Sequence, residues 1–376
     1  MKTCIINGQV VFVDHIQKAN VYFEDNIITE ISERVPEDET IIDAKGQYVA
    51  PGFIDVHTHG RCGSDVMYAT FEDLNAISKG NILTGVTTFL ATTMTMPVED
   101  IYKAVAAVAK YKDQVEGAKI AGVHYEGPFF AVKYKGAQPE ECMIDPTMEN
   151  YNAMTGEYRD VIKKISLAAE RDGACDFIRE ITKEGVVVSL GHTNSTYDEA
   201  VAGIEAGATS GTHTYNAMTP LHHRDAGVVG AVMLHDEVYA ELILDGIHVS
   251  FPAAKILYKM KGNEKLILIT DSFEGAGLPD GKYIIGNQDV YVKDGQARLA
   301  SGNLAASTCA MNQAVRNAYK QIGMPLYDAV RLATYNPAKS QHFEDIGEIA
   351  VGKKADIVIF NDNIDIDTVI VEGVVK

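Results

Sequence analysis

The pattern that most constrains the fold is an alternation of two kinds of segment through the middle of the chain. Short runs rich in β-branched residues end in polar residues, and segments with apolar residues at positions i, i+3 and i+4 lie between them. Strands that alternate with helices predict a parallel sheet, and about eight such units predict an α/β fold of the (β/α)₈ TIM-like barrel type. The strand-type runs span 52–59, 85–93, 118–127, 185–194, 208–216, 239–249 and 265–272, with a weaker eighth at 297–302. The helical patterns span 71–83, 98–112, 158–173, 196–207 and 251–260.

An open, doubly wound sheet is the competing arrangement for the same alternation. Sheets of that kind commonly bind nucleotides through a glycine-rich turn that follows a strand. Neither a G-x-G-x-x-G nor a Walker A sequence follows any of the strand-type runs, so a nucleotide site has no support in the sequence.

The two ends of the chain differ from the middle in their sequence pattern. Both are rich in short β-branched runs that are broken by turn dipeptides such as Asn-Gly and Lys-Gly. We therefore expect residues 1–50 and 346–376 to form one small β-sandwich domain together, and residues 51–345 to form the barrel domain.

Composition limits the partners and the compartment. The 33 basic and 52 acidic residues give a formal net charge of −19. Such a charge repels nucleic acid and anionic membranes, so we expect neither as a partner, and an anionic ligand would need a local cation. Five scattered cysteines, no apolar stretch of about 18 residues and no signal peptide indicate a cytoplasmic protein.

Side chains that bind metals or titrate stand at the ends of nearly all the strand-type runs. In a (β/α)₈ barrel the carboxyl ends of all strands open on one face, so these residues are expected to converge there. Residues two apart on a strand point the same way, which allows two of the histidines to bind one ion. The residues are His57, His59, Glu126, His192, His213, His248 and Asp271.

Imidazole and carboxylate ligands without cysteine are typical of a catalytic Zn²⁺, Fe²⁺, Co²⁺ or Mn²⁺ site rather than a structural zinc site. A divalent ion with an open position acidifies a bound water and polarises a carbonyl or phosphoryl oxygen. Asp271 beside such a water is a candidate to take its proton and pass it to a leaving nitrogen. Its alternative role is the N-cap of a helix.

Two distant segments, PGFIDVHTHG at 51–60 and GEIAVGKKADIVIF at 347–360, resemble the amidohydrolase superfamily. More narrowly, HYEGPF at 124–129, GHTN at 191–194, THTYNAMTPLHHR at 212–224, DGIHV at 245–249 and TDS at 270–272 resemble the family of N-acetylglucosamine-6-phosphate deacetylases. The resemblance covers residues 1–376. It implies hydrolysis of N-acetylglucosamine 6-phosphate to glucosamine 6-phosphate and acetate.

The resemblance also implies roles for the residues at the strand ends. Glu126, His192 and His213 are similar to the ligands of the catalytic metal, and Asp271 matches the catalytic acid and base. His57 and His59 are similar to the pair that completes a second metal site in some members, where Glu126 would bridge. We therefore expect one or two divalent ions per subunit, Zn²⁺ or Fe²⁺.

A second set of residues matches substrate contacts of this family. Arg224 is similar to an arginine that binds the phosphate in the neighbouring subunit's site, which implies a homodimer. Arginine pairs bidentately with phosphate and would supply the cation that an acidic protein needs. The other expected contacts are Ala137, Gln138, Asn216, Ala217, His248, Leu304, Ala305 and Ala306.

The sequence departs from the family pattern in three places. Gln138 stands where some relatives have a histidine, and it can donate a hydrogen bond but cannot act as a cation. Ala306 stands where glycine is common, and Ser272 where alanine is common. Nothing in the sequence reads the orientation of the one hydroxyl that separates glucosamine from galactosamine, so the galactosamine epimer or another amide is an alternative substrate. A non-catalytic assembly protein or a sugar-phosphate sensor is an alternative of another class. The polar segment 128–160 is either a loop over the site or an ordinary insertion.

Overall fold

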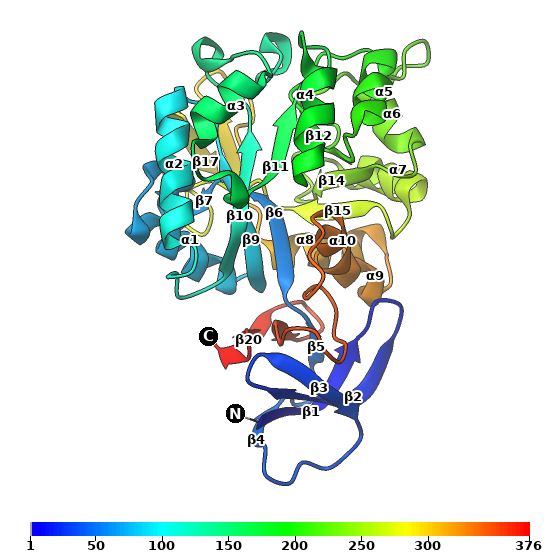
Figure 1. The fold of residues 1–376 in the computed structure, drawn as a ribbon. Helices are drawn as coiled ribbons and strands as arrows, with labels where there is room; N and C mark the ends of the chain where they lie inside the picture. The colour runs from blue at the N-terminus through cyan, green and yellow to red at the C-terminus, as the bar shows by residue number, and fades with distance from the viewer. Residues whose placement is uncertain (1) are drawn as a thin grey trace.

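The computed structural model describes residues 2–376. Eight parallel strands form a nearly closed barrel in the order β6-β9-β10-β11-β12-β13-β14-β15, and helices cover its outside (Figure 1). The first and last strands approach at their carboxyl ends, where the backbone N–H of Asp271 donates to the carbonyl oxygen of His57 at 2.9 Å. The predicted (β/α)₈ barrel is therefore confirmed. The strands are β6 (Phe53–Thr58), β9 (Val86–Thr93), β10 (Lys119–Glu126), β11 (Ile162–Leu167), β12 (Val187–Leu190), β13 (Ser210–Gly211), β14 (Tyr239–Ile243) and β15 (Leu266–Ile269).

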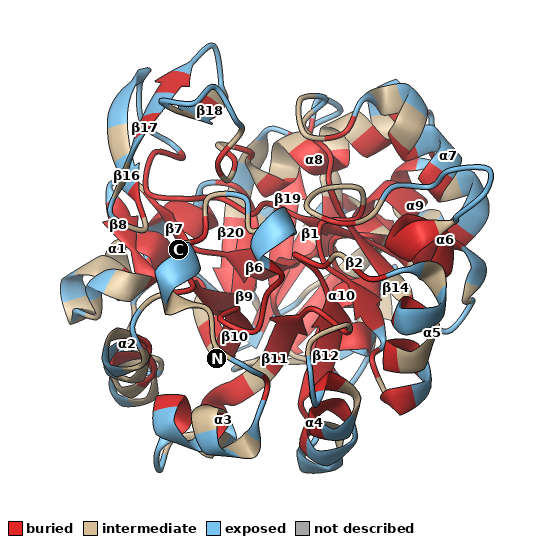
Figure 2. Ribbon diagram, turned by 90° about the horizontal axis from the view of Figure 1, so that it is seen from above, coloured by how far each residue is buried: buried red, intermediate tan, exposed pale blue. Residues whose placement is uncertain are grey.

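The helices pack their apolar faces against the strands, and the view from above shows the buried residues concentrated between the two layers (Figure 2). Four of the five predicted helical segments are helices at nearly the predicted positions. These helices are α1, α2, α5 and α7. The helices are α1 (Phe71–Ile82), α2 (Val98–Tyr111), α3 (Met148–Thr155), α4 (Ala174–Ile181), α5 (Tyr197–Ala206), α6 (Gly227–Leu234), α7 (Phe251–Lys261), α8 (Met311–Asn317), α9 (Leu326–Arg331) and α10 (Tyr335–Ser340). None of these helices is long and apolar enough to cross a membrane.

Two predictions of secondary structure are wrong. The segment 158–173 was expected to be helical, but it contains the strand β11. The strand carries Lys164, whose side chain is fully buried in the barrel and forms an ion pair, so a charged residue stands where an apolar one is expected. The run at 297–302, expected to be the eighth barrel strand, lies partly in β18 of another sheet. With β11 counted, Asp271 follows the eighth barrel strand rather than the seventh.

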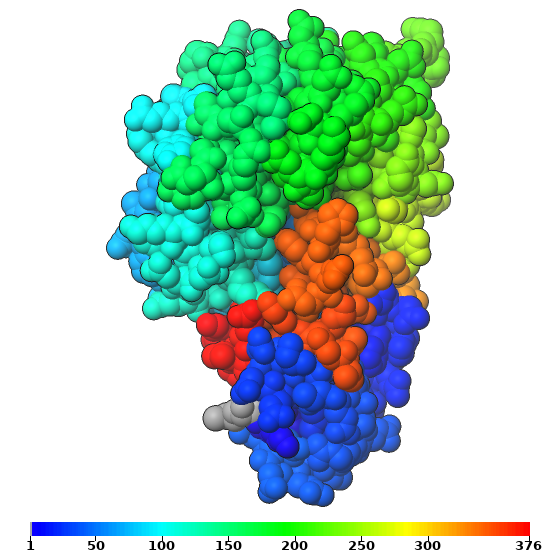
Figure 3. Space-filling model, viewed as in Figure 1, coloured from blue at the N-terminus to red at the C-terminus, as the bar shows by residue number. Residues whose placement is uncertain are grey.

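Strands from both ends of the chain form one separate eight-stranded sheet, as predicted. The space-filling view shows the two termini together at one end of the molecule (Figure 3). This sheet has its own apolar core, and the ion pair between Lys119 and Asp356 (2.5 Å) joins it to the barrel. Its strands are β1 (Lys2–Val11), β2 (Ile16–Glu24), β3 (Ile27–Ser32), β4 (Thr40–Asp43), β5 (Tyr48–Pro51), β19 (Ile357–Phe360), β20 (Ile366–Val371) and β21 (Val374–Val375).

A third, antiparallel sheet interrupts the chain between β15 and α8. It packs on the mouth of the barrel through a small apolar cluster that includes Met94, Phe273 and Ile285. The side-chain amide of Gln288 donates to the backbone carbonyl of Ala137 at 2.6 Å and ties the sheet to the loop after β10. Its strands are β16 (Gly281–Ile285), β17 (Gln288–Lys293) and β18 (Gln296–Leu299), and a short hairpin of β7 (Gly60–Arg61) and β8 (Ser64–Asp65) lies after β6.

Candidate metal centre and active site

Six of the residues predicted from the strand ends converge at the carboxyl end of the barrel, and all six are buried. Their ligand atoms form two groups, within each of which the atoms lie no more than 4.8 Å apart. The first group is Glu126, His192 and His213, and the second is His57, His59 and Asp271. The structure therefore brings together residues that lie up to 214 positions apart in the chain.

In the first group two imidazoles point at the same carboxylate oxygen. Nε2 of His192 and Nε2 of His213 lie 3.2 and 3.1 Å from Oε1 of Glu126, and the two nitrogens lie 3.1 Å from each other. The Nδ1 atoms face backbone carbonyl oxygens, that of Tyr134 at 2.8 Å and that of Asn216 at 3.2 Å. A carbonyl can only accept a hydrogen bond, so each Nδ1 carries the proton and the neutral ring has a lone pair on Nε2.

This arrangement fits a divalent cation. Burial lowers the pKa of His213, which favours the neutral ring that a metal ligand requires. Two lone pairs and a carboxylate oxygen that face one another at about 3.1 Å repel unless a cation lies between them. Backbone carbonyls on the opposite ring nitrogens are the usual means by which proteins orient metal-binding histidines.

Glu126 lies between the two groups. Its Oε1 is 3.3 Å from Nε2 of His57, and its Oε2 is 3.1 Å from Nε2 of His59. Oδ1 of Asp271 lies 3.4 Å from Nε2 of both histidines. One carboxylate thus touches ligand atoms of both groups, which is the arrangement expected of a bridging ligand.

Burial and the neighbouring charges act on the pKa values of the site in opposite directions. Burial acts to lower the pKa of His57, but Glu126 and Asp271 outweigh it and raise the pKa to about 9. Burial acts to raise the pKa of Glu126, but the positive charge of His57 holds it well below its ordinary value. In the protein alone the carboxylates therefore stay ionised and attract positive charge to this position.

The backbone is unusual at three of these residues. His192, His213 and Asp271 have φ values of 45°, 30° and 48°, in the left-handed region that non-glycine residues rarely adopt. Each lies just after its barrel strand, where the chain turns away from the sheet. Such conformations cost on the order of 1–3 kcal/mol each and concentrate at functional sites.

A cavity of about 630 Å³ opens over the metal centre. Both Glu126 and Asp271 face it, and eight of the nine residues predicted to contact substrate line it. These eight are Ala137, Gln138, Asn216, Ala217, His248, Leu304, Ala305 and Ala306. The ninth, Arg224, does not line this cavity. It lies in an exposed loop beside a separate hollow formed with Thr196, Tyr197 and Asp198.

Gln138 makes contacts that the sequence did not indicate. Its side-chain amide donates to Oε2 of Glu126 at 2.8 Å, and its side-chain carbonyl accepts from the backbone N–H of Thr95 at 2.8 Å. One of its two amide hydrogens is therefore already used to hold the carboxylate of Glu126, and one remains for another partner.

Sequence reasoning missed two residues of the cavity wall and one residue that contacts the wall. Lys133 and Lys135 line it and are cations within the same chain. Asp245 holds His248 through an ion pair of 2.7 Å between Oδ2 and Nδ1. The DGIH motif contains both partners of that pair, so the motif carried this signal, whereas nothing in the loop sequence marked the two lysines.

The sequence model of the amidohydrolase family matches residues 48–376. The N-acetylglucosamine-6-phosphate deacetylase of Vibrio furnissii is 40% identical over 327 residues, which are 86% of this chain and 81% of that protein. The N-acetylgalactosamine-6-phosphate deacetylase of Escherichia coli O157:H7 is 34% identical over 93% of this chain and 92% of that protein. A variant of the N-acetyl-D-glucosamine-6-phosphate deacetylase from Mycobacterium smegmatis, solved in complex with N-acetyl-D-glucosamine 6-phosphate, superposes with a TM-score of 0.94 at 30% identity, covering 100% of this chain and 99% of that one.

The matched region contains the whole barrel and all six residues of the metal centre. The chain therefore belongs to the amidohydrolase family, in the branch that contains the deacetylases of N-acetylated hexosamine 6-phosphates.

Proposed function

We propose that this protein hydrolyses the acetamide of N-acetylglucosamine 6-phosphate and releases acetate and glucosamine 6-phosphate. One observation carries the proposal: the first ligand group and the carboxylate of Asp271 face one cavity that is large enough for a sugar phosphate. The names of the relatives supply the substrate class.

The residues divide the chemistry between them. A divalent ion held by Glu126, His192 and His213 would polarise the amide carbonyl and acidify a water molecule. Burial acts to raise the pKa of Asp271, but His57 and His59 hold it below its ordinary value, so the carboxylate is ionised and can accept the proton of the water. The oxygen of the deprotonated water adds to the carbonyl carbon of the amide. Asp271 then delivers its proton to the nitrogen as the C–N bond breaks, which releases acetate and the free amine.

The cavity wall supplies the contacts to the sugar and the phosphate. Asn216, Ala217 and His248 line one side of the cavity, and the loop that carries Lys133 and Lys135 lines another. We assign Arg224 to the phosphate of a neighbouring subunit's site in a homodimer, because its loop is exposed and lies outside the cavity of its own chain.

The cofactor proposal is two divalent ions per subunit, Zn²⁺ or Fe²⁺, with Glu126 between them. Its support is the second ligand group, whose two Nε2 atoms and one carboxylate oxygen all face Glu126 or one another. A cytoplasmic location agrees with five cysteines that are all free.

The test is acetate release from N-acetylglucosamine 6-phosphate and from its galactosamine epimer, with metal content per chain measured before and after chelation. The proposal expects chelator-sensitive release and a higher kcat/KM for the glucosamine substrate. A higher kcat/KM for the epimer would instead make N-acetylgalactosamine 6-phosphate, the sugar in the name of the E. coli relative, the preferred substrate. No release of acetate from either sugar with metal bound would overturn the proposed substrate class.

A further inference from the structure

The interior of the barrel beneath the metal centre holds an ion pair. Nζ of Lys164 on β11 lies 2.6 Å from Oε1 of Glu241 on β14, and both side chains are fully buried. The interior of such barrels is normally filled by layers of valine, isoleucine and leucine. A lysine and a glutamate in this layer therefore call for an explanation.

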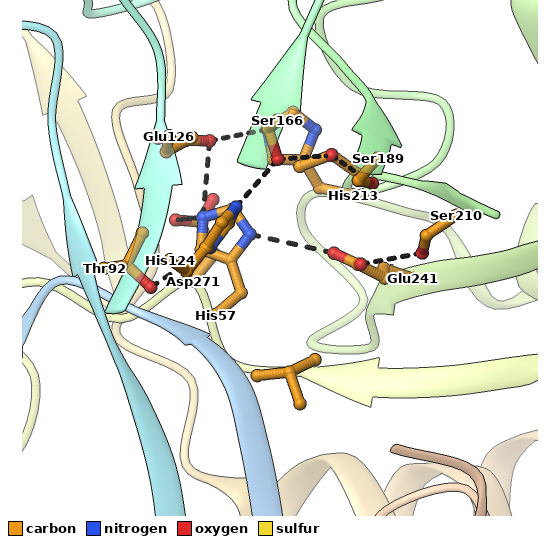
Figure 4. Close-up of polar contacts among 12 residues, drawn as sticks. His57, Thr92, His124, Glu126, Ser166, Ser189, Ser210, His213, Glu241 and Asp271 are labelled. Carbon is orange, nitrogen blue, oxygen red and sulfur yellow. Dashed lines mark hydrogen bonds and ion pairs between the residues drawn. The ribbon is translucent and has the colours of Figure 1, made fainter. Parts of the chain in front are cut away.

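A contribution to the stability of the fold does not explain the buried ion pair. Removing two charges from water costs several kcal/mol per ion, and well-packed apolar residues in place of a buried ion pair are often neutral or stabilising. The pair does not join separate domains, because both strands belong to the same barrel sheet. What distinguishes the pair is its neighbour His57, which lies beside Glu241 (Figure 4).

The two oxygens of Glu241 have different surroundings. Oε1 accepts from Nζ of Lys164 and, at 2.8 Å, from the hydroxyl of Ser210. Oε2 has no hydrogen-bond partner and lies 3.9 Å from Nδ1 of His57, which also has none. Two buried polar atoms without partners, one an acceptor and one able to donate, thus face each other.

No other group offers His57 an acceptor at this nitrogen within the described residues. The ring of His124 stacks edge-on against it with centroids 4.7 Å apart, but its two nitrogens face the hydroxyls of Thr92 (3.3 Å) and Ser166 (2.8 Å). In the first ligand group the corresponding nitrogens of His192 and His213 both face backbone carbonyls. Glu241 occupies the equivalent place for His57.

We infer that Glu241 is a positioning residue for the second metal site: its Oε2 accepts a hydrogen bond from the Nδ1–H of His57, so that the lone pair of Nε2 faces Glu126 and Asp271. Lys164 holds the other carboxylate oxygen, Oε1, and balances its charge. The hydrogen bond requires the distance of 3.9 Å between these two atoms to shorten to about 3 Å. This inference rests on the proposed second ion.

The test is Zn²⁺ binding to the metal-free full chain, measured by equilibrium dialysis and mass spectrometry of bound metal. The double variant Lys164→Met/Glu241→Leu removes the pair together, so that no unpaired charge stays buried. The double variant Lys164→Met/Glu241→Gln is also neutral but keeps an amide oxygen that can face His57. Ser189→Ala is the matched control, because this buried hydroxyl contacts Thr212 and neither His57 nor Glu241.

We expect the first Zn²⁺ to bind with unchanged affinity in all variants, since its ligands keep their contacts. The second Zn²⁺ should bind about 100-fold more weakly in the leucine variant and about tenfold more weakly in the glutamine variant, the range found for partners of metal-binding histidines. The control should bind both ions like wild type. If the leucine variant does not fold, the glutamine variant decides by the same measurement.

The outcomes separate this inference from the proposal on which it rests. Wild-type affinity for the second Zn²⁺ in the folded double variants would overturn the role of Glu241. A wild-type chain that binds only one Zn²⁺ would overturn the two-ion proposal, and this inference with it. Acetate release by the wild-type chain is measured independently of both.

Discussion

Nε2 of His192 and Nε2 of His213 lie 3.1 Å apart, and both nitrogens face Oε1 of Glu126. The Nδ1–H of His192 donates a hydrogen bond to the carbonyl of Tyr134, and the Nδ1–H of His213 donates one to the carbonyl of Asn216. Both rings therefore present the lone pairs of Nε2 to the same small volume. The contacts of the loops after β10 and β13 thus arrange the first ligand group before any ion binds.

Metal removal is therefore expected to destabilise the fold. A ligand that binds only the native state adds about 4 kcal/mol at a thousandfold excess over its Kd, and chelation removes that contribution. We expect a lower Tm after chelation, restored by adding Zn²⁺, in calorimetric scans at fixed pH. His213→Ala removes a ligand of the first ion, so chelation should lower the Tm of this variant by less than it lowers the Tm of the wild-type protein. An unchanged Tm after complete removal of the metal would contradict the prediction.

Asp271→Asn should lower kcat by about 10²–10⁴-fold, the usual contribution of a general acid and base. Asparagine keeps the size of the side chain but cannot accept the proton of the water. The first ion should stay bound, because Asp271 does not belong to that ligand group. Single-turnover acetate release and metal content should be measured on the same sample. Turnover near wild type with metal retained would remove Asp271 from the role of acid and base.

The positions of the metal ligands were predictable because the barrel sets where strand ends meet. His57, Glu126 and His213 could be read as neighbours from strand-end position alone. The strand β11 was not predictable, because the acidic partner of its buried Lys164 is Glu241, 77 residues later in the chain. Read locally, a lysine at this position resembles the exposed face of an amphipathic helix. Of the third sheet, only β18 overlaps a predicted strand, the run at 297–302 that was expected in the barrel, and β16 and β17 were not predicted.

Arg224→Ala should raise KM for N-acetylglucosamine 6-phosphate by about 10- to 100-fold, the loss expected for a hydrogen-bonded charge pair of about 1.5–3 kcal/mol. KM for unphosphorylated N-acetylglucosamine should change little. Arg224→Lys is the matched control and should recover part of the affinity, because it keeps the charge without the bidentate geometry. Mixing Arg224→Ala with Asp271→Asn chains tests the partner assignment: a mixed dimer should regain one working site. Equal effects on both sugars would remove Arg224 from the phosphate site.

The Asp245–His248 pair predicts how substrate affinity changes with pH. Burial acts to lower the pKa of His248, but the carboxylate of Asp245 at 2.7 Å raises it above the ordinary value of 6.5. His248 therefore keeps its positive charge to higher pH than a free histidine and loses it as the pH rises through its raised pKa. Since His248 lines the cavity, KM for an anionic substrate should rise over that upper range.

Asp245→Asn tests this sign directly. The asparagine oxygen can still accept the backbone N–H groups of Ile247 and His248, as Asp245 does at 2.8 Å, so the loop should keep its shape. Without the carboxylate, the pKa of His248 falls and its charge is lost at lower pH. We expect the rise of KM for the phosphorylated sugar to begin at lower pH than in wild type, with no such shift for the unphosphorylated sugar. The titration of His248 followed by NMR should move in the same direction, and an identical midpoint in both proteins would show that Asp245 does not set the charge of His248.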